Sequence, residues 1–161
     1  MNEESISYLP TTGSSYAMAI NTAENSSDVG KQVKIASARD IVDARQKGRI
    51  LAQEIGASST QATLVATVIS ELARNIILYA GSGDIFVKKA HTEKTTGIEI
   101  VAVDRGPGIE NISRAMMNGF STSGGLGLGL SGVKQIADSF QISSELNQGV
   151  RVEVIMWLVK N

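Results

Sequence analysis

The sequence predicts a two-layer α/β sandwich of the α+β class, in which helices cover one face of a mostly antiparallel β-sheet. Two helical segments come early in the chain, and two pairs of strand-like segments come later. This order, βαα ββ α α ββ, groups helices and strands in the way that a sheet covered on one side requires. The 161 residues are 42% hydrophobic, which is enough apolar material for the core of one domain.

Composition narrows the classes of function. The formal net charge is −1, so the sequence lacks the basic footprint of a nucleic-acid-binding protein. The absence of cysteine excludes disulfides, thiolate metal sites and cysteine nucleophiles. No apolar run reaches the roughly 18 residues of a membrane span, and the first twenty residues lack the positive charge of a signal peptide. We therefore expect a cytoplasmic protein with no nucleic-acid and no membrane partner.

The chain is predicted to divide into a tail and one domain. Residues 1–32 are rich in Ser, Thr, Asn, Gly and Glu, and they lack sustained hydrophobic periodicity. Such a segment cannot bury enough apolar surface to offset the entropy that it loses on ordering. We interpret residues 1–32 as a flexible N-terminal tail and residues 33–161 as the folded domain. Scattered apolar side chains in the tail could dock on a partner, but a disordered leader is the simpler interpretation.

Capping signals and helical periodicity predict the first elements. Residues 33–35 are expected to form a short strand. A helix over residues 37–56 has Ser37 as its N-cap and Asp40 as the acidic residue of a capping box, and it ends at a glycine. A second helix starts from a serine cap, either Ser58 or Ser59, and runs to about Tyr79.

The rest of the chain is predicted from the same two kinds of pattern. Period-two alternation marks strands, and a polar stretch over residues 91–96 is expected to be a hairpin loop. The predicted elements are, in order, strands over residues 83–90 and 97–103, helices over residues 111–118 and 128–140, and strands over residues 141–145 and 149–159.

Glu71 and Asn75 are four residues apart and therefore lie on one face of the second predicted helix. That face borders the apolar arc of the helix, so both polar groups are expected to be half-buried. Burial without a partner costs on the order of 1–3 kcal/mol for each group. The partner is either a neighbouring backbone group, since helices often carry a polar pair at the margin of a core, or a bound metal ion and water.

Asp104 directly follows an apolar strand, at an edge of the sheet where ligands commonly bind. Its carboxylate can accept two hydrogen bonds in one plane, one directly from the amino group of a purine and one from a water molecule that also donates to the ring nitrogen. Gly106 and Gly108 would let the backbone approach a flat ring, and Pro107 between them stiffens the turn. The alternative is an ordinary tight turn.

A glycine-rich stretch precedes the helix predicted over residues 128–140. Three glycines at alternate positions could expose consecutive backbone N–H groups to an anion, and the helix that follows adds the positive end of its dipole. The stretch lacks the Gly-Lys-Ser/Thr ending of a P-loop and no βαβ unit surrounds it, so it indicates another kind of phosphate site. The small polar residues before it have the makeup of a closing lid. The run reads Phe120-Ser121-Thr122-Ser123-Gly124-Gly125-Leu126-Gly127-Leu128-Gly129-Leu130.

Together these three segments resemble the N, G1 and G2 boxes of the GHKL ATPase/kinase superfamily. The spacings that match are Glu71-x-x-x-Asn75, Asp104-x-Gly106-x-Gly108 and Gly125-x-Gly127-x-Gly129. The residues around them are similar to one branch of that superfamily, the serine/threonine kinases of the stressosome and the related anti-sigma-factor kinases. The resemblance covers roughly residue 34 to the C-terminus. It implies a Bergerat ATP-binding fold, with ATP and Mg²⁺ as ligands.

The resemblance also implies a role for each matching residue. Asn75 takes the position of the family's Mg²⁺ ligand, and Glu71 that of the general base that prepares a serine hydroxyl for the γ-phosphate. Asp104 takes the position that binds the adenine. The residues implied to lie beside the ring, along the phosphates or in the lid are Gly106, Gly108, Ser121, Thr122, Ser123, Gly125, Gly127 and Gly129.

The implied activity is that of a serine/threonine-protein kinase. Its substrates would be STAS-domain scaffold or antagonist proteins, and on release it would activate a PP2C-type phosphatase. The alternative is a non-catalytic nucleotide-binding switch that acts by docking to the scaffold or the phosphatase. Glu71 favours the kinase, because a pure switch needs no carboxylate one helical turn from the metal ligand.

The sequence departs from the superfamily pattern at two positions. Val150 stands where many members have a threonine that reaches the adenine site through water. Tyr79 stands where relatives often have histidine. Because the threonine contact is missing, we expect weaker binding of ATP unless another group replaces it.

Overall fold

The computed structural model describes residues 30–117 and 129–161. In this part of the chain the strands form one sheet in the order β1-β2-β3-β5-β4, and each neighbouring pair is antiparallel. The strands are β1 (Lys31–Ile35), β2 (Gly83–His91), β3 (Thr95–Asp104), β4 (Ser139–Glu145) and β5 (Gly149–Lys160). The helices are α2 (Ala38–Glu54), α3 (Ser59–Ala80), α4 (Ile112–Ala115) and α5 (Gly129–Ile136).

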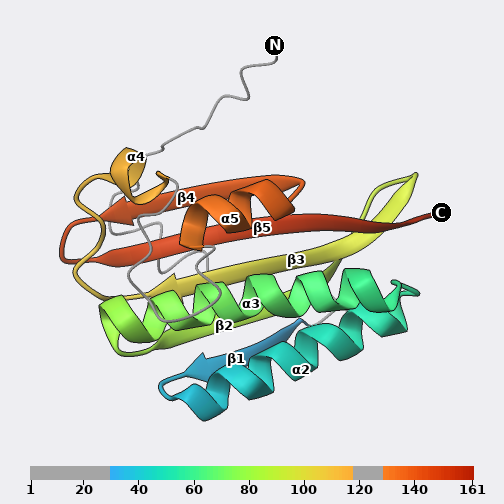
Figure 1. Ribbon diagram of the computed structural model, residues 1–161, viewed down its shortest axis with the longest axis horizontal. Helices are drawn as coiled ribbons and strands as arrows, with labels where there is room; N and C mark the ends of the chain where they lie inside the picture. Colours follow the sequence, from blue (N-terminus) through green and yellow to red (C-terminus); the bar gives the residue numbers. More distant parts are fainter. Residues whose placement is uncertain (1–29, 118–128) are drawn as a thin grey trace.

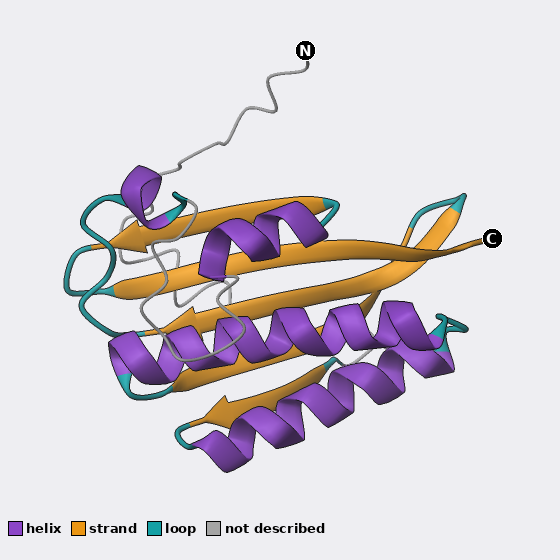
Figure 2. Cartoon of the chain, viewed as in Figure 1, coloured by secondary structure: helices purple, strands orange, loops and turns teal. Residues whose placement is uncertain are grey.

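Helices α2, α3 and α5 lie on one face of the sheet (Figures 1 and 2). Helix α3 runs across the middle of the sheet, α2 packs against α3 near β1, and α5 lies over the side formed by β5 and β4. The predicted two-layer α+β sandwich with a mostly antiparallel sheet is confirmed. Residues 1–29 of the predicted tail lie outside the described residues.

Helix α2 begins where its capping residues predict. The Asp40 carboxylate oxygen Oδ2 accepts hydrogen bonds from the backbone N–H groups of Ala36 and Ser37, both at 2.9 Å. These bonds, chiefly the one from Ala36, hold the pKa of the Asp40 carboxyl below its usual range. The carboxylate therefore satisfies backbone donors at the N-terminus of α2 that the helix itself leaves without partners.

Helix α3 is also defined by local chemistry. Ser58 Oγ accepts the backbone N–H of Gln61 at 3.1 Å, and Gln61 Oε1 accepts the N–H of Ser58 at 2.8 Å, which closes the predicted serine cap. Gly56 follows α2 and Gly81 follows α3, with positive φ angles of 91° and 80°. Residues with a side chain rarely adopt that conformation, so glycine is the natural end of each helix.

The core lies between the sheet and the helices. Alternate residues of the central strands, such as Ile85 and Ile100, point into it and are fully buried, and α3 supplies Ile69 and Leu72 from the other side. Helix α2 approaches α3 closely at Gly48, where an added Cβ would collide with Ile69 Cδ1. The position of α3 therefore depends on contacts with both the sheet and α2.

Helix α3 is the one helix of the described residues that is long and apolar enough to cross a membrane by length and composition. Half of its most apolar window is buried inside the fold, and the helix also carries Glu71, Arg74 and Asn75. Its apolar face is used by the core. This helix therefore has the properties of the core helix of a globular domain.

The helix predicted over residues 128–140 is shorter than expected. Helix α5 ends at Ile136, and Ser139 and Phe140 already belong to β4. Phe140 pairs with Val154 of β5 and packs against the core, while the Asp138 carboxylate accepts the backbone N–H of Trp157 at 2.7 Å. Pairing with β5 therefore overrides a helical pattern that, taken alone, continued through residue 140.

Three other boundaries differ from the prediction by a few residues. Strand β1 starts at Lys31, which pairs with Val87 of β2, two residues before the predicted start. The hairpin loop after His91 is shorter than the predicted 91–96, because the Thr92 hydroxyl accepts the N–H of Thr95 at 2.9 Å and β3 starts there. Helix α4 has four residues and is shorter than the predicted 111–118.

Candidate functional site

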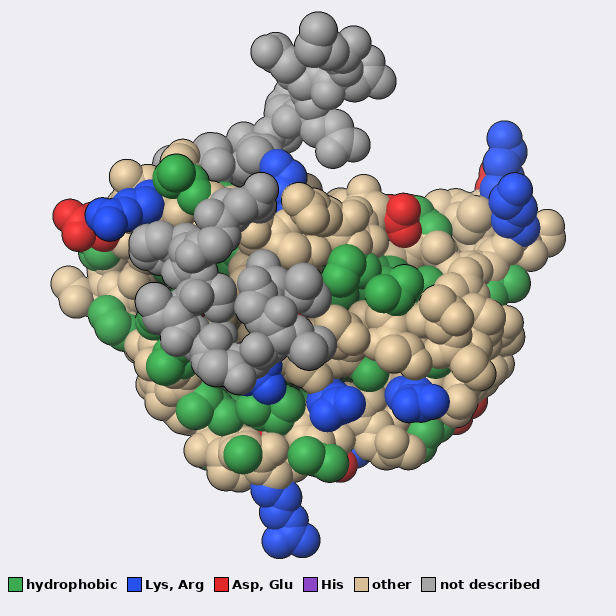
Figure 3. All heavy atoms as spheres, viewed as in Figure 1, with side chains coloured by type: hydrophobic (Ala, Val, Ile, Leu, Met, Phe, Trp, Pro, Cys, Tyr) green, Lys and Arg blue, Asp and Glu red, His purple; other side chains and the backbone are tan. Residues whose placement is uncertain are grey.

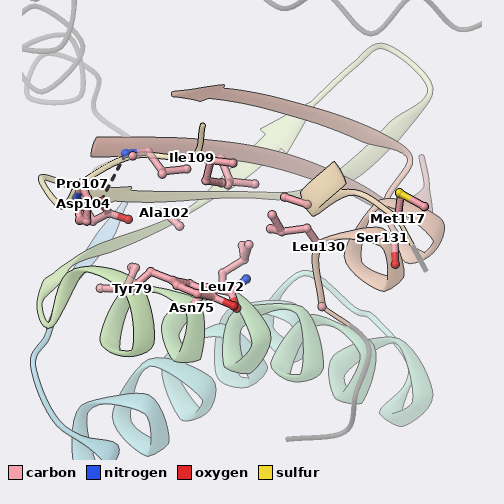
Figure 4. Close-up of a pocket in the computed structure, with 16 residues that line it drawn as sticks. Leu72, Asn75, Tyr79, Ala102, Asp104, Pro107, Ile109, Met117, Leu130 and Ser131 are labelled. Atoms are coloured by element: carbon pink, nitrogen blue, oxygen red, sulfur yellow. Dashed lines mark hydrogen bonds between the residues drawn. The ribbon is translucent and has the colours of Figure 1, made fainter. Parts of the chain in front are cut away.

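A cavity of about 220 Å³ lies between α3 and the sheet. Figure 4 shows α3 forming one wall and β3 and β5 the other, with the turn after β3 at one end and the start of α5 at the opposite end. Most of the lining is apolar. The apolar lining residues are Leu72, Ile76, Tyr79, Ala102, Pro107, Ile109, Ala115, Met117, Leu130, Val150 and Val152. A hollow of this kind suits a flat aromatic ring better than a strongly solvated ligand.

Three segments that the sequence singles out meet at this cavity. Asn75 reaches it from α3, Asp104 and Gly108 from the end of β3, and Gly129 from the start of α5. Gly106 does not line the cavity, and neither does Glu71. The predicted site residues Ser121, Thr122, Ser123, Gly125 and Gly127 lie outside the described residues.

Asp104 is the polar anchor at one end of the cavity. Its side chain is only 8% exposed, and its Oδ1 accepts hydrogen bonds from the backbone N–H groups of Gly106 at 2.9 Å and Val150 at 3.3 Å. No described residue donates a hydrogen bond to Oδ2. Burial raises the pKa of the Asp104 carboxyl, and the two N–H groups offset part of that rise. One oxygen is thus held by the protein, and the other can accept a donor on a ligand.

The turn that carries Asp104 is fastened to the β4–β5 hairpin. Gly149 starts β5 with a φ of 118°, and an added Cβ there would collide with the backbone oxygen of Asp104. Ser144 Oγ accepts the backbone N–H of Ile109 at 2.7 Å and donates to the backbone oxygen of Gly149 at 3.1 Å. Ser144 and Gly149 are not among the site residues predicted from the sequence. Gly149 after a turn was a visible signal, but nothing in the sequence marked Ser144.

Val150 does not leave Asp104 unsupported. The valine side chain lines the cavity, while its backbone N–H donates to Asp104 Oδ1. A hydrogen bond from the main chain does not depend on which side chain stands at position 150. Replacement of the family threonine by valine therefore removes a hydroxyl but leaves the carboxylate fixed in place.

Glu71 is more deeply buried than the predicted half-buried position. It is 1% exposed, and its Oε1 accepts a hydrogen bond from Arg74 Nη1 at 3.3 Å. Its Oε2 is buried and has no hydrogen-bond partner among the described residues. A carboxylate oxygen in this state is costly, so one with no structural partner is a candidate for a role in chemistry. Oε2 lies out of reach of solvent in this structure.

Asn75 is the polar group on the α3 wall. It is partly buried and lines the cavity, and Figure 4 shows it on the side opposite the strands. No described residue hydrogen-bonds to its side chain. The described residues contain no group of three or more His, Cys, Asp or Glu that could hold a metal ion. An Mg²⁺ ion would fit this site in the usual way, through one protein oxygen together with phosphate oxygens and water.

The two ends of the cavity differ in chemistry. Asp104 and Pro107 lie at one end and Leu130 and Ser131 at the other, where α5 begins (Figure 4). The first backbone N–H groups of a helix have no partner within the helix and attract anions. The cavity can therefore hold an elongated molecule with an amino-bearing ring at the Asp104 end and a negative charge at the α5 end.

The chain is similar to known proteins in sequence and in structure. Residues 60–160 match the family model of the histidine kinase-, DNA gyrase B- and HSP90-like ATPases. The chain is 47% identical over 126 residues to the serine/threonine-protein kinase RsbT of Bacillus subtilis, covering 78% of this chain and 95% of that protein. It is 30% identical over 109 residues to an anti-sigma F factor of Anoxybacillus flavithermus, covering 62% of this chain and 71% of that protein. Among solved structures, the mycobacterial sensor histidine kinase MprB aligns with a TM-score of 0.47 and 16% identity, over 83% of this chain and 100% of that chain.

Proposed function

The chain belongs to the histidine kinase-, DNA gyrase B- and HSP90-like ATPase family, also called GHKL, and we propose that it is a serine/threonine-protein kinase that phosphorylates STAS-domain partner proteins. The relationship to a serine/threonine-protein kinase supports the type of activity and ATP as the phosphate donor. One observation of the structure carries the proposal. A buried carboxylate, Glu71, lies one helical turn from Asn75, which faces the same cavity as Asp104.

In this proposal the Asp104 end of the cavity holds the adenine ring of ATP, and the α5 end holds its phosphates. The free Oδ2 of Asp104 would accept a hydrogen bond from the amino group of adenine, and the apolar walls would enclose the ring. The backbone N–H groups at the start of α5 would face the phosphates. Asn75 would supply the protein oxygen for Mg²⁺, which when bound neutralises phosphate charge and orients the γ-phosphate.

The transfer step needs one base and a well-aligned acceptor. Glu71 would accept the proton of the acceptor hydroxyl while the bond between that oxygen and the γ-phosphorus forms. The bond from the γ-phosphorus to the bridging oxygen breaks, and ADP leaves with the electron pair. Phosphoryl transfer depends mainly on positioning and charge neutralisation, so these few groups suffice. For this step the acceptor hydroxyl would have to reach Oε2, which is buried in this structure.

The biological setting proposed is partner switching in the cytoplasm during a stress response. Phosphorylation of a STAS-domain scaffold or antagonist would free the kinase, and the freed kinase would activate a PP2C-type phosphatase in a stressosome pathway. Two relatives support regulation of this kind, since one is a serine/threonine kinase and the other an anti-sigma factor.

A non-catalytic switch remains the second candidate, and one observation favours it. Glu71 does not line the cavity and is 1% exposed, which is also what a purely structural carboxylate would show. In that case the chain would bind ATP and dock to its partners without transferring phosphate. The two candidates differ in whether a partner protein gains a phosphoryl group.

The deciding experiment incubates the full chain with ATP, Mg²⁺ and purified STAS-domain proteins and follows the intact mass of each protein. The kinase proposal predicts that one STAS-domain protein gains the mass of a phosphoryl group on serine or threonine. The Asp104→Asn variant is the matched control and should leave that mass unchanged. Binding of ATP and of a STAS-domain protein without any mass gain would contradict the kinase and support the switch.

A further inference from the structure

Arg74 is the described side chain that contacts the buried carboxylate of Glu71. We propose that Arg74 is a positioning residue for phosphoryl transfer, which anchors Oε1 of Glu71 and leaves Oε2 free to take the proton of the acceptor hydroxyl. The inference rests on the proposed role of Glu71 as the base. Nothing in the family resemblance assigns a role to this arginine.

The burial of the two partners separates this ion pair from an ordinary surface pair. Glu71 is 1% exposed and Arg74 is 32% exposed, whereas the pair of Lys47 and Asp43 on α2 is 38% and 53% exposed. Exposed pairs contribute little, because water solvates both charges equally well without the contact. A buried carboxylate lacks that alternative, so removing its cation is costly. The Glu71–Arg74 contact therefore holds the buried carboxylate in place more than a surface pair would.

The geometry of the contact leaves one oxygen unused. Arg74 approaches with Nη1 alone and contacts only Oε1, at 3.3 Å. A guanidinium that paired with both oxygens would occupy the acceptor sites that a general base needs. Asp104 shows the same arrangement, since backbone donors hold Oδ1 and no described residue donates to Oδ2. Each of the two buried carboxylates of the described chain is thus anchored through one oxygen.

The position of Arg74 predicts that it acts on rate and not on nucleotide affinity. It precedes Asn75 on α3 but does not line the cavity, so it has no contact with the proposed adenine site. The side of the molecule on which the helices cover the sheet carries other Lys and Arg side chains over α2 and α3 (Figure 3). Arg49 is exposed on α2 and contacts no described carboxylate. Its substitution by glutamine is therefore a matched control, which removes one arginine from a helix of the same layer.

The test compares Arg74→Gln, Arg74→Lys and Arg49→Gln in the phosphorylation of the STAS-domain protein, with ATP binding measured separately by a fluorescent ATP analogue. Arg74→Gln is expected to lower kcat by about tenfold or more, with nucleotide affinity unchanged. This loss is smaller than the roughly hundredfold or greater rate enhancement that a general base provides, because Glu71 itself remains. Arg74→Lys, which keeps a cation beside Glu71, should recover most of the rate. Arg49→Gln should behave as the unmodified protein.

A second pair of variants shows whether Arg74 acts through Glu71. In a Glu71→Gln background, Arg74→Gln should cause no further loss of rate. Independent, multiplicative losses would contradict the inference, as would a faster Arg74→Gln enzyme, which would mean that the arginine blocks the base. If Arg74→Gln fails to fold, Arg74→Lys decides, and a lysine variant that folds, binds ATP and transfers no phosphate overturns the positioning role.

The outcomes also separate this inference from the proposed function. If Glu71→Gln phosphorylates the partner as fast as the unmodified chain, the base assignment itself is wrong. If Glu71→Gln is slow and Arg74→Gln is as fast as the unmodified chain, only the role of Arg74 is wrong.

Discussion

Asp104 and Glu71 are the acidic residues that the fold buries among its described residues, and both belong to the proposed site. Burial of a carboxylate costs free energy unless donors compensate for it. The fold supplies two backbone donors to Asp104 and one guanidinium to Glu71, and no described residue donates to the second oxygen of either carboxylate. At this scale the site consists of two incompletely satisfied acceptors that a nucleotide and a hydroxyl group would complete.

The raised pKa of Asp104 predicts how nucleotide binding depends on pH. In the proposed site adenine would donate to the ionised carboxylate, so binding would require the deprotonated form. Because burial raises the pKa, affinity should begin to fall at a higher pH than for an ordinary aspartate, as pH decreases from about 7 towards 4. Titrations with a fluorescent ATP analogue across this range measure the effect. An affinity that stays constant down to pH 4 would contradict the assignment of Asp104.

The same shift predicts the opposite dependence for the stability of the free protein. A carboxyl group whose pKa is raised by folding favours the folded state in its protonated form, and this contribution is lost as pH rises through the folded-state pKa. Asp104→Asn keeps an oxygen for the N–H groups of Gly106 and Val150 but removes the charge. At pH 7 the variant should be at least as stable as the unmodified chain, while ATP binding is lost. Urea unfolding of the free protein checks the stability.

At the scale of elements, the start of β5 holds the turn after β3 in place. Gly149→Ala should destabilise the fold by about 1–3 kcal/mol and weaken ATP binding, because φ is positive there and the new Cβ would push against Asp104. Gly56→Ala is the matched control. Gly56 also has a positive φ, but nothing lies within 4 Å of its added Cβ, so only stability should fall. Equal effects of the two variants on ATP binding would contradict this account of β5.

Local patterns predicted the elements whose ends have local causes. The caps at Asp40 and Ser58 consist of hydrogen bonds between residues three apart in the sequence, so the sequence pattern alone indicates them. The predicted end of the last helix, at residue 140, lies four residues beyond the end of α5 at Ile136. The strand that starts at Ser139 forms by pairing with β5, and the residues of α5 carry no pattern that predicts this pairing. Sequence patterns therefore indicate which helices and strands exist more reliably than they indicate the residues at which those elements end.

The same distinction holds for the site. Asn75, Asp104 and the glycines were recognisable because their spacing repeats a family motif. The hydrogen bonds of Ser144 to Ile109 and Gly149, and the deep burial of Glu71, depend on which distant segments lie together, and the sequence contains no signal for them. The predicted lid residues lie outside the described residues, so their role stays a prediction.

At the scale of the whole molecule, the cavity lies between the two layers, with α3 on one side and β3 and β5 on the other. A ligand bound there contacts both layers at once and should stabilise the fold as a whole. The described domain begins with β1 and contains Asn75, Asp104 and Gly129 without residues 1–29. The proposed site is therefore built by the domain.

Removal of residues 1–29 should accordingly leave ATP affinity unchanged. Isothermal titration of the truncated and full-length chains with ATP and Mg²⁺ provides the comparison. A clear loss of affinity in the truncated chain would show that the N-terminal segment forms part of the site.

The most direct test of the central claim is a single-turnover measurement on Glu71→Gln with ATP, Mg²⁺ and the STAS-domain acceptor. The kinase account predicts that ATP binds as it does to the unmodified chain, while phosphoryl transfer slows by about a hundredfold or more, as expected when a general base is removed. Transfer at the unmodified rate, with ATP bound, would contradict the account.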